Sequence, residues 1–299
     1  MIEKVIIRGV QGLEEFKALE TLQKETWQSE DLVILPAHHL HALSDNGAII
    51  LGAFTEQALT PANMVGFIVG IIGTVEDGLE DRRDDVAAAR LKLYSAIMGV
   101  HPTYQNLGLG YQLKLAQRQE AMRLGLRMIN WTFDPLETRN AQLNIGKLGG
   151  ICRQYLPNYH GQMAGINGGV PTDRFKVEWW ITNNRAKSRV DKGRSALSLQ
   201  AMLDGGAEII NPLGFNQHGF AVPPERFGPL SPLMFLVEVP TNFQLLKQTD
   251  VALALAWRQH TEAIFTGAFE RGYMVTDFIY HRGEEDMSRA FYLLTNQSG

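Results

Sequence analysis

The stretch Gly99-Val-His-Pro-Thr-Tyr-Gln-Asn-Leu-Gly-Leu-Gly-Tyr111 lies between a strand-like pattern and a helix-like pattern. Before it, residues 91–100 place side chains alternately on two faces, which predicts a β-strand. After it, apolar residues recur at helical spacing: Leu109, Leu113 and Ala116, with Leu115, Met122 and Leu126 beside them. A glycine-rich turn between a strand and a helix exposes backbone N–H groups at the positive end of the helix. The stretch therefore predicts a site for a phosphate or a pyrophosphate.

Two common phosphate-binding loops do not fit this stretch. The dinucleotide fingerprint needs a third glycine three residues after the second, and the position three residues after Gly110 is Leu113. The nucleotide P-loop ends in Gly-Lys-Ser/Thr, and no such triplet occurs here. What remains is Gln105-Asn-Leu-Gly108-Leu-Gly110, which fits Q/R-x-x-G-x-G/A and follows Val100-x-Pro102. An ordinary strand–helix turn is the alternative interpretation.

This pattern resembles the coenzyme A pyrophosphate loop of the GNAT superfamily of acetyltransferases. The resemblance implies an α/β (α+β) fold, with a mixed sheet that splays apart after the motif strand and helices that flank it. The pantetheine arm of acetyl-CoA, or of another acyl-CoA, lies in that opening like an added strand. The implied cofactor-binding residues on this strand and turn are Met98, Gly99, Val100, Gln105, Asn106, Leu107, Gly108, Leu109, Gly110 and Tyr111. Glycine is expected at 108 and 110 because a side chain would block the close approach of phosphates.

The composition is typical of a globular enzyme. The chain has 299 residues, of which 45% are hydrophobic and 20% charged, and its net charge of -4 argues against a general nucleic-acid binder. Its one cysteine, Cys152, excludes internal disulfides, suits a reducing compartment and is expected to be buried and inert. The longest apolar run, residues 65–75, is shorter than the about 20 residues that span a bilayer. A strand-like run follows Met1 directly, so we expect no targeting signal, a cytoplasmic location and no membrane partner.

The order of the expected elements over residues 1–183 is that of the GNAT fold. Strands are expected at residues 3–10, 48–55, 64–73, 91–100, 127–133, 151–155 and 175–182, and helices at 13–27, after Pro36, at 109–124 and at 138–148. We assign residues 184–200 to a linker and residues 201–299 to a smaller C-terminal α/β domain. From residue 233 onward that domain has the order strand–helix–strand–strand. Our hypothesis is a degenerate GNAT-like half that completes the acceptor pocket.

A second family signature, N-x-x-A-x-x-x-Y-x-K-x-G-F, falls on the helix expected at 138–148. The sequence matches it at Ala141, Lys147 and Gly149. It departs from the asparagine, tyrosine and phenylalanine of the signature at Thr138, Ile145 and Gly150. In the family that tyrosine is often the general acid that protonates the leaving thiolate, so the acid is unassigned here. Asn140 and Asn144 on the same helix are candidates to bind pantetheine, with solvated helix positions as the alternative.

Acetyl transfer to an amine needs a group that accepts a proton, and it gains from holding the amine and the thioester together. The candidate catalytic residues are Tyr94, Asp134, Glu178 and Tyr155. Tyr94 lies on the motif strand, Asp134 ends the neighbouring strand, and Glu178 lies in the last strand of the domain. Tyr155, like the nearby Tyr159, is a candidate to replace the missing acid. For these residues the alternatives are a core aromatic, a turn or helix cap, a surface carboxylate and ordinary packing.

Other charged or histidine-rich segments have plainer interpretations. For His38, His39 and His41 we predict no metal, because zinc sites usually use wider, mixed ligand sets. The acidic stretch 76–85 attracts a cationic acceptor or is a solvated loop. The basic run 185–194 is a solvated linker, or it contacts the 3′-phosphate of the coenzyme or an acidic acceptor.

The sequence therefore predicts an acyl-CoA-dependent N-acyltransferase, with acetyl-CoA as the donor and direct attack of an amine on the thioester. The acceptor is a small-molecule or peptide amine, and apolar strands at the domain edge make a homodimer a further hypothesis. A non-catalytic acyl-CoA-binding or sensor module is the competing interpretation, which the missing tyrosine favours. A GNAT-like transferase that uses aminoacyl-tRNA is a third, and the negative net charge and the intact pyrophosphate motif count against it.

Overall fold

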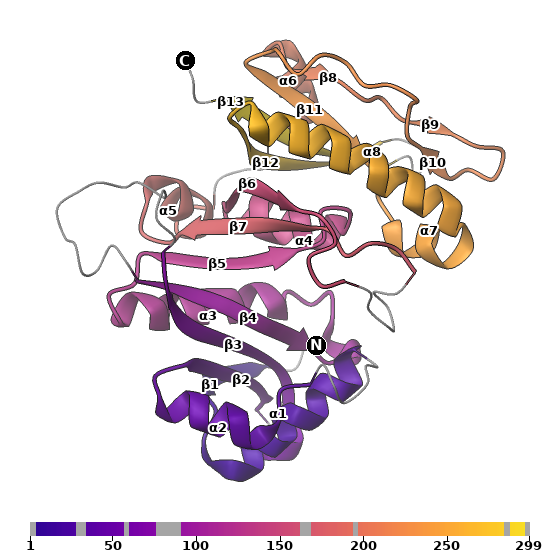
Figure 1. Cartoon of the computed structure of the whole chain (residues 1–299). Helices are drawn as coiled ribbons and strands as arrows, with labels where there is room; N and C mark the ends of the chain where they lie inside the picture. The colour runs from indigo at the N-terminus through magenta and orange to yellow at the C-terminus, as the bar shows by residue number, and fades with distance from the viewer. Residues whose placement is uncertain are drawn as a thin grey trace. The chain divides into compact units, whose positions relative to one another are not determined.

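The structure is a computed structural model (Figure 1), and it describes residues 4–27, 34–56, 60–75, 91–161, 169–193, 197–283 and 288–296. The chain divides into two compact units. Unit 1 comprises Met1–Trp131 and Trp180–Thr182, and unit 2 comprises Thr132–Trp179 and Asn183–Gly299. The division falls within a strand, whereas the sequence places a boundary at residue 183. The acidic stretch 76–85 lies outside the described residues.

Unit 1 is built on a row of neighbouring strands. Their order is β1 (Val5–Gly9), β2 (Ile49–Thr55), β3 (Met64–Thr74), β4 (Leu91–Val100) and residues 128–131 of β5 (Met128–Phe133). Neighbours from β1 to β4 are antiparallel, whereas β4 and β5 are parallel. A short 3-10 helix, η2 (Pro61–Asn63), precedes β3. Isoleucine, valine and phenylalanine recur in β2 and β3, and such residues favour a pleated, buried surface.

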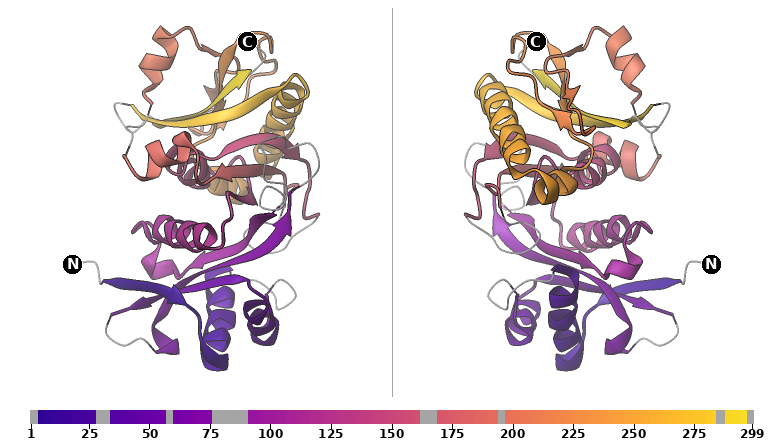
Figure 2. Two further views of the ribbon diagram at one scale, coloured as in Figure 1. Left: turned by 90° about the vertical axis from the view of Figure 1, so that its left-hand side faces the viewer. Right: turned by 90° about the vertical axis from the view of Figure 1, so that its right-hand side faces the viewer.

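Helices cover both faces of these strands, so β2 is buried along its whole length. α1 (Gly12–Trp27) and α2 (Ala37–Asp45) pack on one face, and α3 (Leu109–Arg123) packs on the other (Figure 2). The core under α1 and α2 includes Phe16, Leu40, Phe54 and Phe67. On the other face, a Cβ built on Gly66 of β3 would lie 3.3 Å from side-chain carbons of Leu109 and Leu113. Glycine in β3 therefore lets α3 approach closely.

The buried face of α3 differs from the apolar stripe that the sequence predicts. Leu109 and Leu113 are buried as expected. They share that face with the polar residues Lys114, Gln117 and Arg118. Met122, which the sequence places beside the apolar stripe, is exposed. The helical spacing identifies the helix but not its inner face, because long polar side chains occupy buried positions here.

Unit 2 has its own row of strands. Their order is residues 132–133 of β5, β7 (Arg174–Trp180), β6 (Ile151–Leu156), β12 (Tyr273–Arg282), β13 (Ser288–Asn296), β11 (Met234–Val239) and β8 (Glu208–Ile209). Neighbours from β7 to β11 are antiparallel, and β8 is parallel to β11. A separate antiparallel hairpin joins β9 (Gly214–Phe215) and β10 (Ala221–Val222).

The helices of unit 2 connect and cover these strands. α4 (Thr138–Ala141) continues as a π-helix, η5 (Gln142–Lys147), in place of the single α-helix that the sequence predicts. The others are α5 (Asn184–Val190), α6 (Leu199–Asp204), α7 (Phe243–Thr249) and α8 (Val251–Glu270). A π-turn inside a helix is rare and frequently lies at a functional site.

One topology occurs twice along the chain from β5 onward. β5, the helical segment α4–η5, β6 and β7 follow one another in the chain, and these strands have the spatial order β5-β7-β6. β11, the helices α7 and α8, β12 and β13 follow one another in the same way, with the order β11-β13-β12. The two segments meet where Val275 of β12 pairs with Cys152 of β6. The C-terminal segment thus has the predicted strand–helix–strand–strand order, and its topology repeats that of β5 to β7.

The first residues assigned to a linker form a helix. α5 is capped by the side chain of Asn183, and its Arg189 is buried. Arg189 donates hydrogen bonds to the Gly146 carbonyl of η5 and to the Asp277 carboxylate of β12. Residues 184–190 of the predicted linker are thus helical, and this part of the basic run binds carbonyl and carboxylate groups inside unit 2. Residue 194 of that run lies outside the described residues.

Candidate active site

β4 and β5 separate soon after they meet. Their pairing consists of Leu93↔Ile129 and Tyr94↔Asn130. β4 then continues to Val100, and on its other edge it stays paired with β3 as far as Gly66↔Val100. In the described part of unit 1, the backbone from Ser95 to Val100 therefore has one edge held by β3 and no strand beside the other. This is the opening that the resemblance implies.

A β-bulge lies directly after the last pair between β4 and β5. Val69 of β3 pairs with Ile97 and Gly70 pairs with Ser95, so Ala96 is the extra residue. A bulge bends its strand and increases the local twist. It also decides which backbone N–H groups of the following residues face the open edge, because these groups alternate between the two edges of a strand.

The glycine-rich stretch forms a tight turn between β4 and α3. The short 3-10 helix η4 (Pro102–Tyr104) follows β4, and Nε2 of Gln105 donates to the Val100 carbonyl at 3.1 Å, which closes the turn. Asn106 (φ 64°) and Gly108 (φ 82°) adopt left-handed backbone conformations. Gly108 is the N-cap of α3. The Tyr111 N–H donates to the Gly108 carbonyl at 3.1 Å. The N–H groups of Leu109 and Gly110 lie in the first turn of α3, where an α-helix offers no acceptor, so this end of the helix favours an anion.

Glycine is required at positions 99 and 108 for different physical reasons. At Gly108 the positive φ disfavours any L side chain, although a Cβ there would meet no atom within 4 Å. At Gly99 a Cβ would lie 2.5 Å from Cε1 of Phe67, in the core under α1. Gly110 has no positive φ. Room for phosphates at Gly108 and Gly110 stays a prediction.

The residues predicted to bind the cofactor in unit 1 gather on the open half of β4 and on the turn. The exposed ones are Asn106, Leu107 and Gly108. The half-buried ones are Met98, Val100, Gln105, Gly110 and Tyr111, and the buried ones are Gly99 and Leu109. Tyr94, a candidate catalytic residue, is half-buried and belongs to the last pair between β4 and β5.

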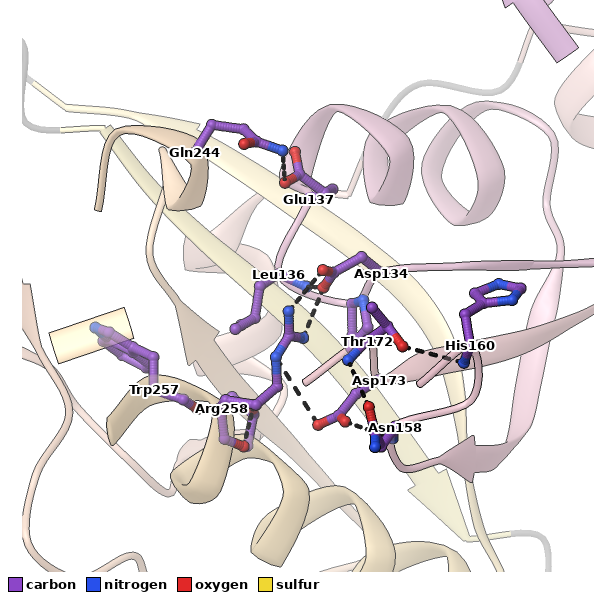
Figure 3. Close-up of polar contacts among 12 residues, drawn as sticks. Asp134, Leu136, Glu137, Asn158, His160, Thr172, Asp173, Gln244, Trp257 and Arg258 are labelled. Atoms are coloured by element: carbon purple, nitrogen blue, oxygen red, sulfur yellow. Dashed lines mark hydrogen bonds and ion pairs between the residues drawn. The ribbon is translucent and has the colours of Figure 1, made fainter. Parts of the chain in front are cut away.

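Two candidate catalytic residues of unit 2, Asp134 and Tyr155, belong to one network. Figure 3 shows Asp134 of this network with Arg258, Asp173 and Asn158. Both carboxylate oxygens of Asp134 accept hydrogen bonds from Arg258 of α8, at 2.8 and 2.6 Å. The hydroxyl of Tyr155 donates to Asp173 at 2.5 Å, and the Asn158 N–H donates to the other oxygen of Asp173 at 2.8 Å. Nε of Arg258 lies 3.9 Å from Asp173, so the guanidinium links the two carboxylates.

The surroundings of Asp134 and Tyr155 favour a structural role for these side chains over proton transfer. Burial, and then the charge of Asp173, raise the pKa of Tyr155 well above its ordinary value, which makes its phenol a weaker acid. Burial alone would lower the pKa of Arg258, but its hydrogen bonds to Asp134 and the nearby negative charges raise it, so the guanidinium stays charged. The Asp134 carboxylate also accepts from the Leu136 N–H at 2.9 Å. Its oxygens are therefore occupied by the arginine and by its own turn.

The helix that carries the second signature has an apolar residue at the tyrosine position. Ile145 is fully buried in η5. Asn144 is buried as well, and its carbonyl accepts from the Gly150 N–H at 2.9 Å, whereas Asn140 is exposed on α4. Contacts from Asn140 and Asn144 to pantetheine stay predictions.

The remaining candidate, Glu178 of β7, is buried. Its carboxylate lies 3.5 Å from Nη1 of Arg153, so its charge is partly compensated. β7 pairs with β6 beside Cys152, whose pKa is raised well above the ordinary value by burial first and by Glu178 second. Cys152 is fully buried, and burial favours its protonated thiol, which fits the buried and inert cysteine that the sequence predicts.

Arg258 and Asp173 are residues that sequence reasoning did not select. Arg258 lies on α8, far along the chain from Asp134, and no local pattern links them. Asp173 directly precedes β7, and from the sequence alone it is interpreted as a turn residue. The one available signal was a charged residue directly after an apolar run, since Arg258 follows residues 251–257 in α8.

Two kinds of feature are absent from the described residues. No group of histidine, cysteine, aspartate or glutamate side chains there is arranged to hold a metal ion, and His38, His39 and His41 are exposed on α2. Among the described helices, none combines the length and the apolar character that crossing a membrane requires.

The chain is similar to GNAT acetyltransferases of solved structure. NAA60 of Arabidopsis thaliana in complex with acetyl-CoA is 13% identical over 60% of this chain and 100% of its own, with a TM-score of 0.49. The ribosomal-protein-S18-alanine N-acetyltransferase of Escherichia coli is 14% identical over 60% and 96%, with a TM-score of 0.43. An acetyltransferase of the GNAT family from Streptococcus pneumoniae is 16% identical over 58% and 98%, with a TM-score of 0.42. No family model and no curated protein matches the chain.

Proposed function

We propose that this protein is an acyl-CoA-dependent N-acyltransferase, with acetyl-CoA as the donor. The observation that carries the proposal is the open edge of β4 from Ser95 to Val100, which leads directly into the turn before α3. A pantetheine arm pairs with such an edge as an added strand, and a pyrophosphate fits the N-terminus of the helix that follows. One ligand of the right length thus uses both features.

In this proposal, residues of β4 and of the turn bind acetyl-CoA so that its thioester lies near the bulge at Ala96. Backbone groups from Met98 to Val100 hold the pantetheine, and N–H groups from Gln105 to Gly110 surround the pyrophosphate. An N–H of the open edge near Ala96 polarises the thioester carbonyl. The acceptor amine then attacks the carbonyl carbon, the C–S bond breaks, and the amine gives up a proton while the thiolate of coenzyme A takes one.

Tyr94 and Glu178 are our candidates for handling these protons. Tyr94 lies next to the open edge of β4, and Glu178 is a buried carboxylate of β7 that forms an ion pair with Arg153. We propose that Asp134 and Tyr155 instead hold the turn after β5, since Arg258 and Asp173 occupy their polar atoms. The acceptor class stays a small-molecule or peptide amine, and a homodimer stays a hypothesis.

A non-catalytic acyl-CoA-binding or sensor module is the second candidate. The observation that favours it is Ile145, a fully buried residue that has no proton to give. Such a module binds acetyl-CoA at the same strand edge and turn, but it releases no coenzyme A when amines are added.

The deciding experiment is a calorimetric titration with acetyl-CoA and with free coenzyme A. Gly108→Glu places a carboxylate where phosphates are expected, and Gly125→Glu is its matched control. Both glycines have positive φ and open space at the Cβ position, and they flank the same helix, α3. We expect micromolar binding by the wild type, a loss of about 100-fold or more in Gly108→Glu, and a change of about threefold or less in Gly125→Glu.

Each result has a definite meaning. Equal losses in both variants would indicate a general effect of strain, and the turn would then not be the phosphate site. No binding by the wild type would overturn the proposed function. If the wild type binds, thiol release with a panel of small-molecule and peptide amines separates the enzyme from the sensor.

A further inference from the structure

Lys114 is a buried lysine in the middle of α3. Its side chain runs inward, its residue is 2% exposed, and its Nζ donates to the Ser95 hydroxyl at 2.9 Å. The same Nζ lies 3.6 Å from the centre of the Trp131 ring. Burial lowers the pKa of Lys114 well below its ordinary value. A lysine in this position costs folding free energy, so a plain packing role would be served better by leucine or methionine.

The two residues that Lys114 contacts mark the point where β4 and β5 separate. The last pair between these strands is Tyr94↔Asn130. Ser95 and Trp131 are the next residue on each strand, where a continued parallel ladder would pair. Lys114 therefore reaches from α3 to both strands at the base of the opening, one residue before the bulge at Ala96.

The surroundings of Lys114 are unusually polar for the interior of unit 1. Gln117 is fully buried, and neither its Oε1 nor its Nε2 has a hydrogen-bond partner in the described structure. The same holds for Oδ1 of Asn130, a member of the last strand pair. Nε2 of Gln117 lies 2.8 Å from a Cβ built on Gly70, the residue that pairs with Ser95. Polar groups thus gather under the bulge although each unpaired one costs about 1–3 kcal/mol.

We propose that Lys114 and Ser95 form a polar bridge that fixes where β4 separates from β5 and which residue of β4 forms the bulge. Lys114 is then a positioning residue for the thioester end of acyl-CoA. A bulge displaced by one residue would exchange the N–H groups that face the open edge for those that face β3. The donor would lose its hydrogen-bond pattern on the strand. The role toward acyl-CoA rests on the proposed function, whereas the role in strand separation does not.

The test uses the full chain and three variants. Ser95→Ala leaves the Lys114 amine without its partner, so it lowers stability. Ser95→Ala/Lys114→Met removes both polar groups of the bridge, and we expect it to be at least as stable as the wild type in urea because neither partner is left behind unpaired. Arg123→Met is the control, because Arg123 is an exposed cation on the same helix. Acetyl-CoA affinity by calorimetry and amide hydrogen exchange by mass spectrometry are measured on all four proteins.

If the bridge positions the donor, the double variant stays folded but binds acetyl-CoA about tenfold or more weakly, while Arg123→Met binds like the wild type. Wild-type affinity in a stable double variant would overturn the positioning role.

The exchange data test strand separation without any ligand. We expect slower exchange in the double variant for amides of Ser95 to Met98, because β4 and β5 can then pair further. Unchanged exchange there would overturn the bridge, and a wild type that binds no acetyl-CoA would overturn the proposed function alone.

Discussion

At the scale of single residues, one arginine decides whether the turn after β5 is stable. The side chain of Arg258 is 2% exposed and lies between two carboxylates, Asp134 at 13% and Asp173 at 1%. Its guanidinium also lies 4.8 Å from the centre of the Phe243 ring. Removing the arginine takes away the cation that lies between the two carboxylates, and such losses are larger than the net worth of the pair itself.

We predict that Arg258→Met lowers the free energy of unfolding by about 3–5 kcal/mol. The control is Arg282→Met, because Arg282 is exposed near the end of β12, and it should change stability by about 0.5 kcal/mol or less. Urea unfolding followed by circular dichroism measures both. A loss below about 1 kcal/mol in Arg258→Met would mean that the carboxylates are solvated or protonated once the arginine is gone.

How far single residues can be predicted from the sequence depends on how local their partners are. The turn from Gln105 to Gly108 was predictable, because its conformation is set by residues next to one another. Lys114 and Arg258 were not predictable, because a charged residue in a helical pattern is normally assigned to the solvent face. Their burial is set by Ser95, Trp131 and Asp134, which only the folded chain brings near.

At the scale of elements, close packing of α3 on β3 depends on glycine. A Cβ on Gly70 would lie 2.8 Å from Nε2 of Gln117 and 2.8 Å from Cδ2 of Leu93. On Gly73 of the same strand, the nearest atom would be Cε of Lys92 at 3.9 Å. The two positions thus test the same substitution in one strand, with and without a helix pressed against it.

We predict that Gly70→Ala destabilises the protein by about 1–3 kcal/mol, because Gln117 and Leu93 must move. Gly73→Ala should be neutral or stabilising by up to about 1 kcal/mol, since alanine reduces the freedom of the unfolded chain. Thermal or urea unfolding of both variants decides the matter. Equal changes in stability for the two variants would show that α3 can shift away from β3 at little cost. The polar interior under α3 would then be loosely packed.

Most strands and helices were predictable, because their periodicity is local. The element order through β7 and the strand–helix–strand–strand order after residue 233 appear as the sequence indicates. The inner face of α3, the π-turn of η5 and the helix α5 were not foreseen. In each case, a polar side chain lies in the interior at that element: Lys114 under α3, and Arg189 of α5 at the Gly146 carbonyl of η5 and at Asp277.

At the scale of the whole molecule, the sequence predicts a domain that ends at residue 183, whereas unit 2 contains strands from both sides of that boundary. β6 and β7 lie in one row with β12, β13 and β11. Phe175 of β7 packs against Phe265 and Phe269 of α8 and against Tyr292 of β13. A resemblance that covers three fifths of a chain suggests a boundary where the resemblance ends, but it carries no information about which core the last strands share.

We therefore predict that a chain ending at Gly193 does not reach a native state on its own. It would lose Arg258 from Asp134 and Asp173, Asp277 from Arg189, and the aromatic partners of Phe175. The expected product keeps helical and strand signals in far-ultraviolet circular dichroism but binds a hydrophobic dye and unfolds without a sharp transition, while the full chain unfolds cooperatively. A sharp transition and a dispersed amide spectrum for the shortened chain would establish residues 1–193 as a self-sufficient domain. The second copy of the β5–β7 topology would then be an appendage, whereas failure to fold would make it half of the core that holds the turn after β5.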